Sequence, residues 1–114
     1  MNRQSKEFLN SAEIEAVEVN PGMTRKMMGY NNQIMMAEVH FEKGAIGYKH
    51  QHFHSQTSYV VSGSFEVTIG EKTRIMNAGD GFFVEPNIIH GAVCLEEGIL
   101  VDVFSPVRED FLAK

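Results

Sequence analysis

Runs in which hydrophobic and polar residues alternate recur along this chain. Two clear examples are residues 35–41, with apolar residues at Met35, Ala37, Val39 and Phe41, and residues 65–69, with apolar residues at Phe65, Val67 and Ile69. Successive side chains of a strand point to opposite faces, so each run predicts a strand with one buried face.

Turn-forming residues separate these runs. A spacing of roughly ten residues between turns is typical of a small antiparallel barrel or sandwich such as a jelly roll. Helix is expected only at residues 5–9 and 108–113. The turn signals are Asn20-Pro21-Gly22, Asn31-Asn32, Lys43-Gly44, Ser62-Gly63-Ser64, Gly70-Glu71-Lys72, Ala78-Gly79-Asp80-Gly81 and Glu96-Glu97-Gly98.

The size of the chain predicts one domain, and the strand pattern makes this domain all-β. At 114 residues and 43% hydrophobic composition, the chain can bury a single core. We expect residues 1–20 to form an N-terminal arm or edge strand and residues 21–114 to form the barrel with a C-terminal tail.

Charge and cysteine content restrict the partners and the compartment. The formal net charge of -5 argues against nucleic acid as a partner, because no basic surface is available to neutralise phosphates. No segment is long and apolar enough to predict a membrane span. Cys94 is the single cysteine, and the first residues contain no apolar export segment, so a cytoplasmic location is expected.

Two clusters carry the candidate chemistry. The first contains Gly44, His50, His52, Gln56 and Gly63, and the second contains Gly79 and His90. Three imidazoles and one amide that converge from separate strands suit a transition metal and leave coordination positions open. We therefore expect His50, His52, Gln56 and His90 to bind one divalent ion.

Other roles for these polar residues remain open. His54 could replace Gln56 or His50 as a ligand, and is otherwise expected at the rim of the pocket. His40 lies outside both clusters and is expected to be a structural or surface histidine. Gln56 could instead be a strand residue that is hydrogen-bonded to its neighbours.

The two clusters together resemble the signature of the cupin superfamily. Gly44, His50, His52 and Gly63 are in register with the first cupin motif, and Gln56 stands where most cupins carry Glu.

In the second motif Gly79 and His90 are in register, while three positions depart from the pattern: Pro86 is displaced by one place, Asn87 replaces glycine and Cys94 replaces asparagine. Asn tolerates the left-handed conformation, so the turn at Asn87 can survive. The resemblance implies a double-stranded β-helix, that is, a jelly-roll barrel.

Five segments narrow the resemblance to the KdgF-type pectin and alginate degradation cupins. They are residues 22–27, 39–47, 59–63, 86–91 and 102–111. Members of that group convert 4,5-unsaturated monouronates to the linear keto form. The resemblance therefore implies a metal-dependent, non-redox, ring-opening enzyme with a small acidic sugar as substrate.

Because this chain has Gln56 where most cupins have Glu, the expected metal ligands carry no negative charge. Without a carboxylate ligand, a divalent ion keeps its full positive charge and should attract an anion such as a uronate carboxylate more strongly. Imidazole-rich shells suit Ni, Zn, Fe, Mn or Cu without selecting among them.

The segment 99–104 adds a carboxylate to an apolar strand. Leu100, Asp102 and Phe104 share one face, and a carboxylate on an inner face is costly unless it is paired or functional. One interpretation is an ion pair between Asp102 and Arg108 that fastens the tail. The other makes Asp102 the proton-transferring residue, Arg108 a clamp on the substrate carboxylate and Phe104 a wall against the sugar ring. The resemblance implies the second set of roles.

Several alternatives accompany this hypothesis. Arg25 and Lys26 could add an anion contact, although a solvated strand end is the expectation. A cupin oxygenase, a sugar-binding module and a purely structural barrel are the other function classes. The methionines Met27, Met28, Met35 and Met36 could pack a partner barrel or the core, and the resemblance favours a homodimer.

Overall fold

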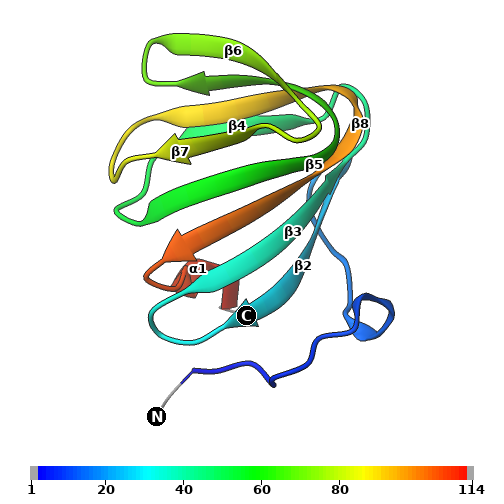
Figure 1. The fold of residues 1–114 in the computed structure, drawn as a ribbon, viewed down its shortest axis with the longest axis vertical. Coiled ribbons are helices and arrows are strands. Elements are labelled where there is room, and N and C mark those ends of the chain that lie inside the picture. The colour runs from blue at the N-terminus through cyan, green and yellow to red at the C-terminus, as the bar shows by residue number, and fades with distance from the viewer. Residues whose placement is uncertain (1–2, 113–114) are drawn as a thin grey trace.

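The computed structural model describes residues 3–112 of the chain. Figure 1 shows the strands, which are β1 (Val17–Asn20), β2 (Met23–Tyr30), β3 (Met35–Phe41), β4 (Ile46–His50), β5 (Ser55–Ile69), β6 (Lys72–Asn77), β7 (Gly81–Val84) and β8 (His90–Ser105). Two short helices flank them, the 3-10 helix η1 (Ser11–Glu13) and α1 (Glu109–Leu112). Every strand pair is antiparallel, so the prediction of an all-β barrel is confirmed.

The sheet is organised around the two longest strands, β5 and β8. The strand order is β1-β2-β3-β8-β5-β6, with β4 paired to β8 and β7 paired to β5. The β5–β8 register shifts between Val60 and Phe65. On one side of the shift β8 pairs with β4, and on the other side it pairs with β3. Both strands therefore bend and contribute to both layers of the barrel, as the right-hand edge of Figure 1 shows.

Glycines at this bend allow the two backbones to approach closely. Gly63 has a φ of +83°, and a Cβ at this residue would lie 2.5 Å from the carbonyl oxygen of Glu97. Asn87 is the one described non-glycine residue with positive φ, at 66°. This value confirms the expectation that Asn87 adopts the left-handed conformation at the displaced turn.

The alternating patterns predict the buried faces correctly. Met35, Ala37, Val39 and Phe41 are all buried in β3. The main core cluster lies between the two layers, where the Phe41 and Phe65 rings meet edge to face at 5.0 Å. A smaller cluster joins Met35 and Phe104 to Val107, beside α1.

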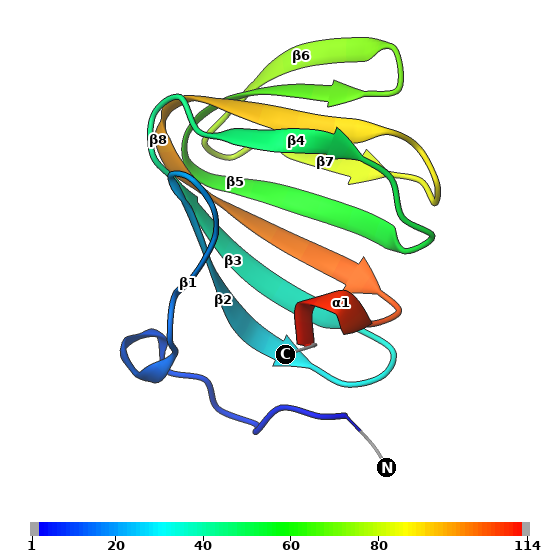
Figure 2. The ribbon, with the colours of Figure 1, turned by 180° about the vertical axis from the view of Figure 1, so that it is seen from behind.

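The N-terminal segment runs along the outside of the barrel before β1 pairs with β2, as Figure 2 shows. The helix predicted at residues 5–9 is wrong, because these residues form no regular structure, with a bend at Glu7, and in this segment only Ser11–Glu13 form a helical turn. The ammonium group of Lys26 fastens this segment by donating to the carbonyl oxygen of Ser11 at 2.8 Å. The C-terminal helix begins at Glu109, one residue later than predicted, and the predicted end at Ala113 lies outside the described residues.

The methionines divide between the core and the surface. Met35 is fully buried and Met27 packs against its cluster, whereas Met36 is exposed. Two of the four methionines therefore serve the core of this chain, and the homodimer stays a prediction. Among residues 3–112, the structure has no helix with the length and hydropathy needed to span a membrane.

Two glycines with nearly equal backbone angles test the close approach at the bend. Gly44 has a φ of +87° with open space around a Cβ, whereas Gly63 at +83° has backbone atoms within 2.6 Å. We expect Gly44→Ala to cost about 1–2 kcal/mol from backbone strain alone. Gly63→Ala should cost about 1–3 kcal/mol more, because β5 and β8 must separate. Urea unfolding of both variants measures the difference, and equal losses would contradict the proposed clash.

Candidate active site

Three of the four predicted metal ligands come together at one end of the barrel. His50 ends β4, His90 begins β8, and these two residues are paired in register. His52 follows in the loop between β4 and β5 and not on a strand, and its ring still reaches the cluster. One nitrogen from each of the three rings lies within 4.8 Å of the other two.

Backbone carbonyls orient all three imidazoles. The Nδ1 atom of His50 lies 2.9 Å from the carbonyl oxygen of Tyr48, that of His52 lies 3.1 Å from His54, and that of His90 lies 2.8 Å from Ile88. A carbonyl only accepts, so each Nδ1 carries the proton. The lone pair of each ring is then on Nε2, which is the arrangement of ligating histidines in metal sites.

Gln56 joins the cluster through its amide oxygen. The Gln56 Nε2 atom donates to Ser58 Oγ at 3.0 Å, and Ser58 Oγ donates its single proton to Asp102 Oδ1 at 2.6 Å. Ser58 can therefore only accept from Gln56, which fixes the orientation of the amide. The Gln56 Oε1 atom faces His52 Nε2 at 3.0 Å.

This arrangement fits a cation. His52 lies between two acceptors, the carbonyl of His54 and the amide oxygen of Gln56, but a neutral imidazole has only one N–H. Burial lowers the pKa of His52, which disfavours a second proton. Among residues 3–112, the buried Nε2 atom of His90 has no hydrogen-bond partner, and burial lowers the pKa of His90 to about 4. Three imidazole nitrogens this close together are the donor set that a divalent transition metal needs.

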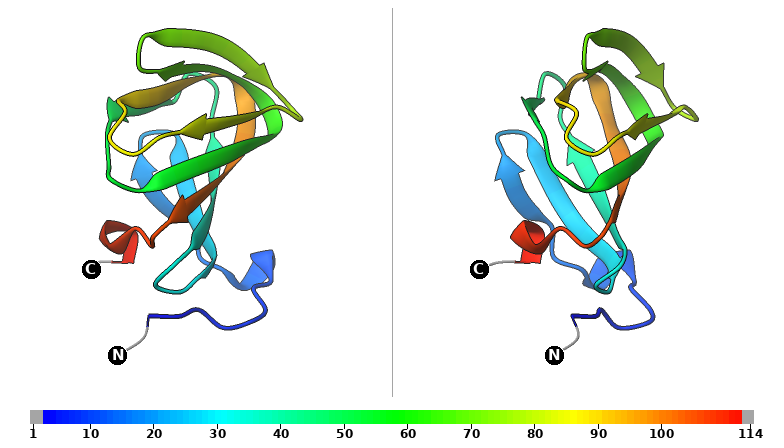
Figure 3. Two further views of the ribbon diagram at one scale, coloured as in Figure 1. Left: turned by 60° about the vertical axis from the view of Figure 1, so that its left-hand side comes forward. Right: turned by 90° about the vertical axis from the view of Figure 1, so that its left-hand side faces the viewer.

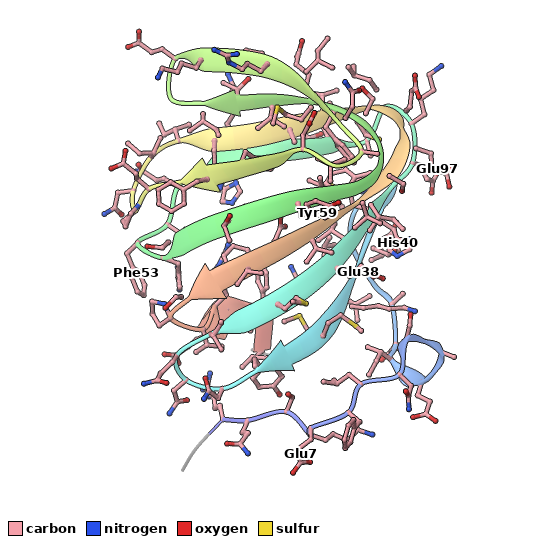
Figure 4. The ribbon with its side chains drawn as sticks, in the orientation of Figure 1. Glu7, Glu38, His40, Phe53, Tyr59 and Glu97 are labelled. Atoms are coloured by element: carbon pink, nitrogen blue, oxygen red, sulfur yellow. The ribbon has the colours of Figure 1, made fainter. Side chains whose placement is uncertain are left out.

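The two remaining histidines have other surroundings. The His54 ring is buried and stacks on Phe53, with centroids 4.0 Å apart, and it lies outside the three-histidine cluster. His40 lies on the outer face of β3, where its Nε2 atom contacts the carboxylate of Glu38 at 2.9 Å. Figure 4 shows this exposed pair, so the expectation of a structural or surface histidine is confirmed for His40.

Asp102 lies on the inner face of β8 and is partly buried. Its register partner in β5 is Ser58, which is also its hydrogen-bond donor. Burial raises the pKa of Asp102 to about 6, although Ser58 and the nearby Arg108 act in the opposite direction. The carboxylate is therefore able to exchange a proton near neutral pH.

Arg108 is buried, but its partner differs from the one expected. Its Nε and Nη2 atoms donate to the two carboxylate oxygens of Asp110, at 3.0 and 2.7 Å. The Asp102–Arg108 ion pair is therefore wrong, because Asp102 is bound by Ser58. The Arg108 guanidinium lies over Phe104 at 5.2 Å and over Phe111 at 4.2 Å, measured to the ring centroids.

A cavity of about 400 Å³ connects the histidine cluster to this charged end. Figure 3 shows that the β4–β5 loop and α1 lie at the same end of the barrel. Of the seven residues predicted for the site, six line the cavity, and His52 reaches it through the cluster. The functional lining includes His50, Gln56, His90, Asp102, Phe104 and Arg108, together with Arg25 and Phe111.

Sequence reasoning missed several of these neighbours. Ser58 alternates with Gln56 on the inner face of β5, so strand periodicity could have placed it beside the ligand, although nothing in the sequence marks Asp102 as its partner. Phe111 and Asp110 lie in a tail whose path the sequence does not specify. The expectation of a solvated strand end is wrong for Arg25, which is partly buried over the Phe111 ring at 3.6 Å.

Known proteins resemble this chain in both sequence and fold. The family model described as "Cupin domain" matches residues 37–104. A protein described as "Pectin degradation protein KdgF" from Dickeya dadantii is 48% identical over 97 residues, covering 83% of this chain and 88% of that protein. The solved structure of an RmlC-like cupin from Shewanella frigidimarina has a TM-score of 0.93 and 47% identity, covering 95% of this chain and 97% of the other. The structure of KdgF from Halomonas sp. has a TM-score of 0.89 and 38% identity, covering 94% and 99%.

Metal binding should stabilise the folded protein through His90. Added to metal-free protein at about 100 times its dissociation constant, Zn²⁺ or Ni²⁺ should raise the free energy of unfolding by about 3 kcal/mol. His90→Ala should lose most of this gain, whereas His40→Ala, which alters an exposed histidine, should keep it. Thermal unfolding with and without metal measures the gain, and an unchanged gain in His90→Ala would contradict the site.

The burial of Asp102 should make stability depend on pH in the metal-free protein. The pKa of Asp102 is about 6 in the folded chain against an ordinary value of 3.8, so the folded state holds this proton more tightly. The Asp102 contribution to stability therefore falls as the pH rises through this interval. Asp102→Asn should gain on the order of 2 kcal/mol over the wild type at about pH 7.5 relative to about pH 4. Urea unfolding at both pH values measures this, and the idea fails if the difference between the two proteins is independent of pH.

Proposed function

Because this chain belongs to the cupin family and is closely similar to KdgF proteins, we propose that it is a metal-dependent enzyme that opens the ring of 4,5-unsaturated monouronates. The product is the linear keto uronate, and the substrate is a small acidic sugar of the kind released in pectin or alginate breakdown. The observation that carries the proposal is one cavity that holds a neutral metal-ligand cluster, the carboxylate of Asp102 and the guanidinium of Arg108.

The reaction requires a proton to move within the substrate. The hydroxyl on C1 loses its proton, the bond between C1 and the ring oxygen breaks, and C1 becomes an aldehyde. The electron pair of that bond stays on the former ring oxygen, which forms an enolate with C5 and C4. This enolate becomes a ketone at C5 when C4 receives a proton. The formula of the sugar does not change, and no oxidant or reductant is consumed.

Asp102 is the residue proposed to move this proton. Its pKa of about 6 lets the carboxylate accept a proton and return it near neutral pH. The Ser58 hydroxyl fixes the Oδ1 atom of Asp102 and leaves Oδ2 for the substrate. The same hydroxyl accepts from the Gln56 amide, so the proton carrier and the ligand cluster have a fixed relative position.

The ligand cluster supplies positive charge. A divalent ion held by His50, His52, Gln56 and His90 would stabilise oxyanion character on the substrate. Because Gln56 contributes an amide where most cupins carry a carboxylate, none of these four side chains neutralises the ion. The cavity therefore favours an anionic substrate over a neutral sugar.

Phe104 and Arg108 complete the proposed site on the other side. Phe104 is almost fully buried and meets the His52 ring in a T-shaped contact, with centroids 5.7 Å apart, so it forms an apolar wall. Arg108 already binds Asp110 through Nε and Nη2. Its Nη1 donors and its charge are what remain for the substrate carboxylate.

Lyase-generated unsaturated monouronate tests the proposal directly. The wild-type protein loaded with metal should remove the ultraviolet absorbance of the ring double bond and produce the linear keto sugar. Asp102→Asn should lower kcat by at least about 100-fold, the usual contribution of general acid–base catalysis, with unchanged metal content. Glu66→Gln removes an exposed carboxylate from the outer face of β5 and should turn over normally.

Two results would count against this function. One is normal turnover by Asp102→Asn, which would remove the carboxylate from the chemistry. The other is oxygen consumption during turnover, which would indicate an oxygenase in place of a non-redox isomerisation.

A further inference from the structure

Arg25 is a charged residue on the inner face of β2. Met23 and Met27 lie on the same face, and both pack against the core clusters. The register partner of Arg25 in β3 is Val39, which is also buried. The strand therefore directs a guanidinium into the barrel at a position where its neighbours two residues away are apolar.

The C-terminal helix fixes the orientation of this guanidinium. The Cζ atom of Arg25 lies 3.6 Å from the ring centroid of Phe111, a distance that places the planar group against the ring face. The Arg108 guanidinium lies 4.2 Å from the same centroid. Two cations therefore share one aromatic ring at one end of the cavity. Stacking occupies the flat face of Arg25 and leaves its N–H groups free at the edge.

The two cations differ in what binds them. Both carboxylate oxygens of Asp110 accept hydrogen bonds from Arg108, and the carboxylate of Asp102 accepts one from Ser58. Within residues 3–112, the guanidinium of Arg25 has no hydrogen-bond acceptor and no ion-pair partner. Burial and the neighbouring Arg108 lower the pKa of Arg25, as expected for a cation without a bonded anion. Such a group gains more from an incoming carboxylate than an arginine that is already paired.

We infer that Arg25 binds the carboxylate of the substrate through its free N–H edge and makes the pocket selective for acidic over neutral sugars. This role rests on the proposed function for the identity of the substrate. It also changes the division of labour between the arginines. Arg25 provides the two-pronged contact, whereas Arg108, tied to Asp110, contributes charge and packs against Phe104 and Phe111.

Kinetics separate this role from a purely structural one. A hydrogen-bonded charge contact of this kind predicts that Arg25→Gln raises KM by about 10- to 100-fold. The contact is made in both ground and transition states, so kcat should stay within about threefold. Arg25→Lys keeps the charge but lacks the planar fork, and should fall between Arg25→Gln and the wild type.

A matched control removes the same charge elsewhere. Arg74 is an exposed arginine in β6, outside the cavity lining, so Arg74→Gln should leave KM and kcat unchanged. Thermal unfolding of all variants shows how much stability the Phe111 stack provides. If Arg25→Gln does not fold, Arg25→Lys supplies the comparison.

Direct binding gives a readout that does not depend on turnover. We expect the metal-loaded wild type to bind galacturonate at least about 10-fold more tightly than galactose, since only the acid presents a carboxylate to Arg25. Arg25→Gln should reduce this preference to about threefold or less, whereas Arg74→Gln should keep it. The preference that remains in Arg25→Gln comes from the charges of the metal and of Arg108. Isothermal titration calorimetry measures both sugars with each protein.

The outcomes distinguish this inference from the proposed function. Loss of the preference in Arg25→Gln supports the carboxylate contact even if the unsaturated uronate is not converted. An Arg25→Gln protein whose KM and galacturonate affinity both lie within about twofold of the Arg74→Gln control would overturn it. Failure of the wild type to prefer galacturonate to galactose would also overturn it, whether or not ring opening is observed.

Discussion

The pairing of β5 with β8 is the constraint on which the site depends. These strands stay paired from Ser55 opposite Ser105 to Ile69 opposite His90. They bend together where Gly63 of β5 crosses residues 96–98 of β8. In this register Ser58 lies opposite Asp102, and Gln56 lies opposite Phe104. A shift of one residue would turn these inward side chains to the outer surface. The bend also brings the start of β8 back beside the end of β4, which closes the histidine cluster.

This register gives the polar interior a definite direction. The Ser58 proton goes to Asp102, so Ser58 must accept from Gln56, and the Gln56 oxygen must then face His52. Each member has one available role, and the carbonyls behind the three histidines remove the remaining freedom of the rings. Such a chain is satisfied at every link except the point where the ring lone pairs meet. The interior is thus complete for a cation and incomplete without one.

Local sequence patterns predicted the fold well and the charged end of the pocket poorly. Alternation identified the buried faces of β3 and β5, because it depends on neighbours along one strand, and the spacing of the motif residues identified the three histidines. The partners of Asp102, Arg108 and Arg25 depend on how distant segments meet. Charge alone suggested an Asp102–Arg108 pair, but Asp110 lies only two residues from Arg108 and binds it through two bonds. The helix expected at residues 5–9 failed because the arm packs along the outside of the barrel, where tertiary contacts outweigh a weak local preference.

The Phe111 ring under the two arginines belongs to a helix of only four residues. A helix of this length has no stability of its own, so α1 depends on Phe111 against Phe104 and on the Arg25 and Arg108 guanidiniums. The histidine cluster, in contrast, is supported by β4, β5 and β8, whose hydrogen bonds belong to the barrel as a whole. The two ends of one cavity therefore have different supports: strands of the barrel hold most of the ligand end, whereas the arginine end can open by local fraying of the tail.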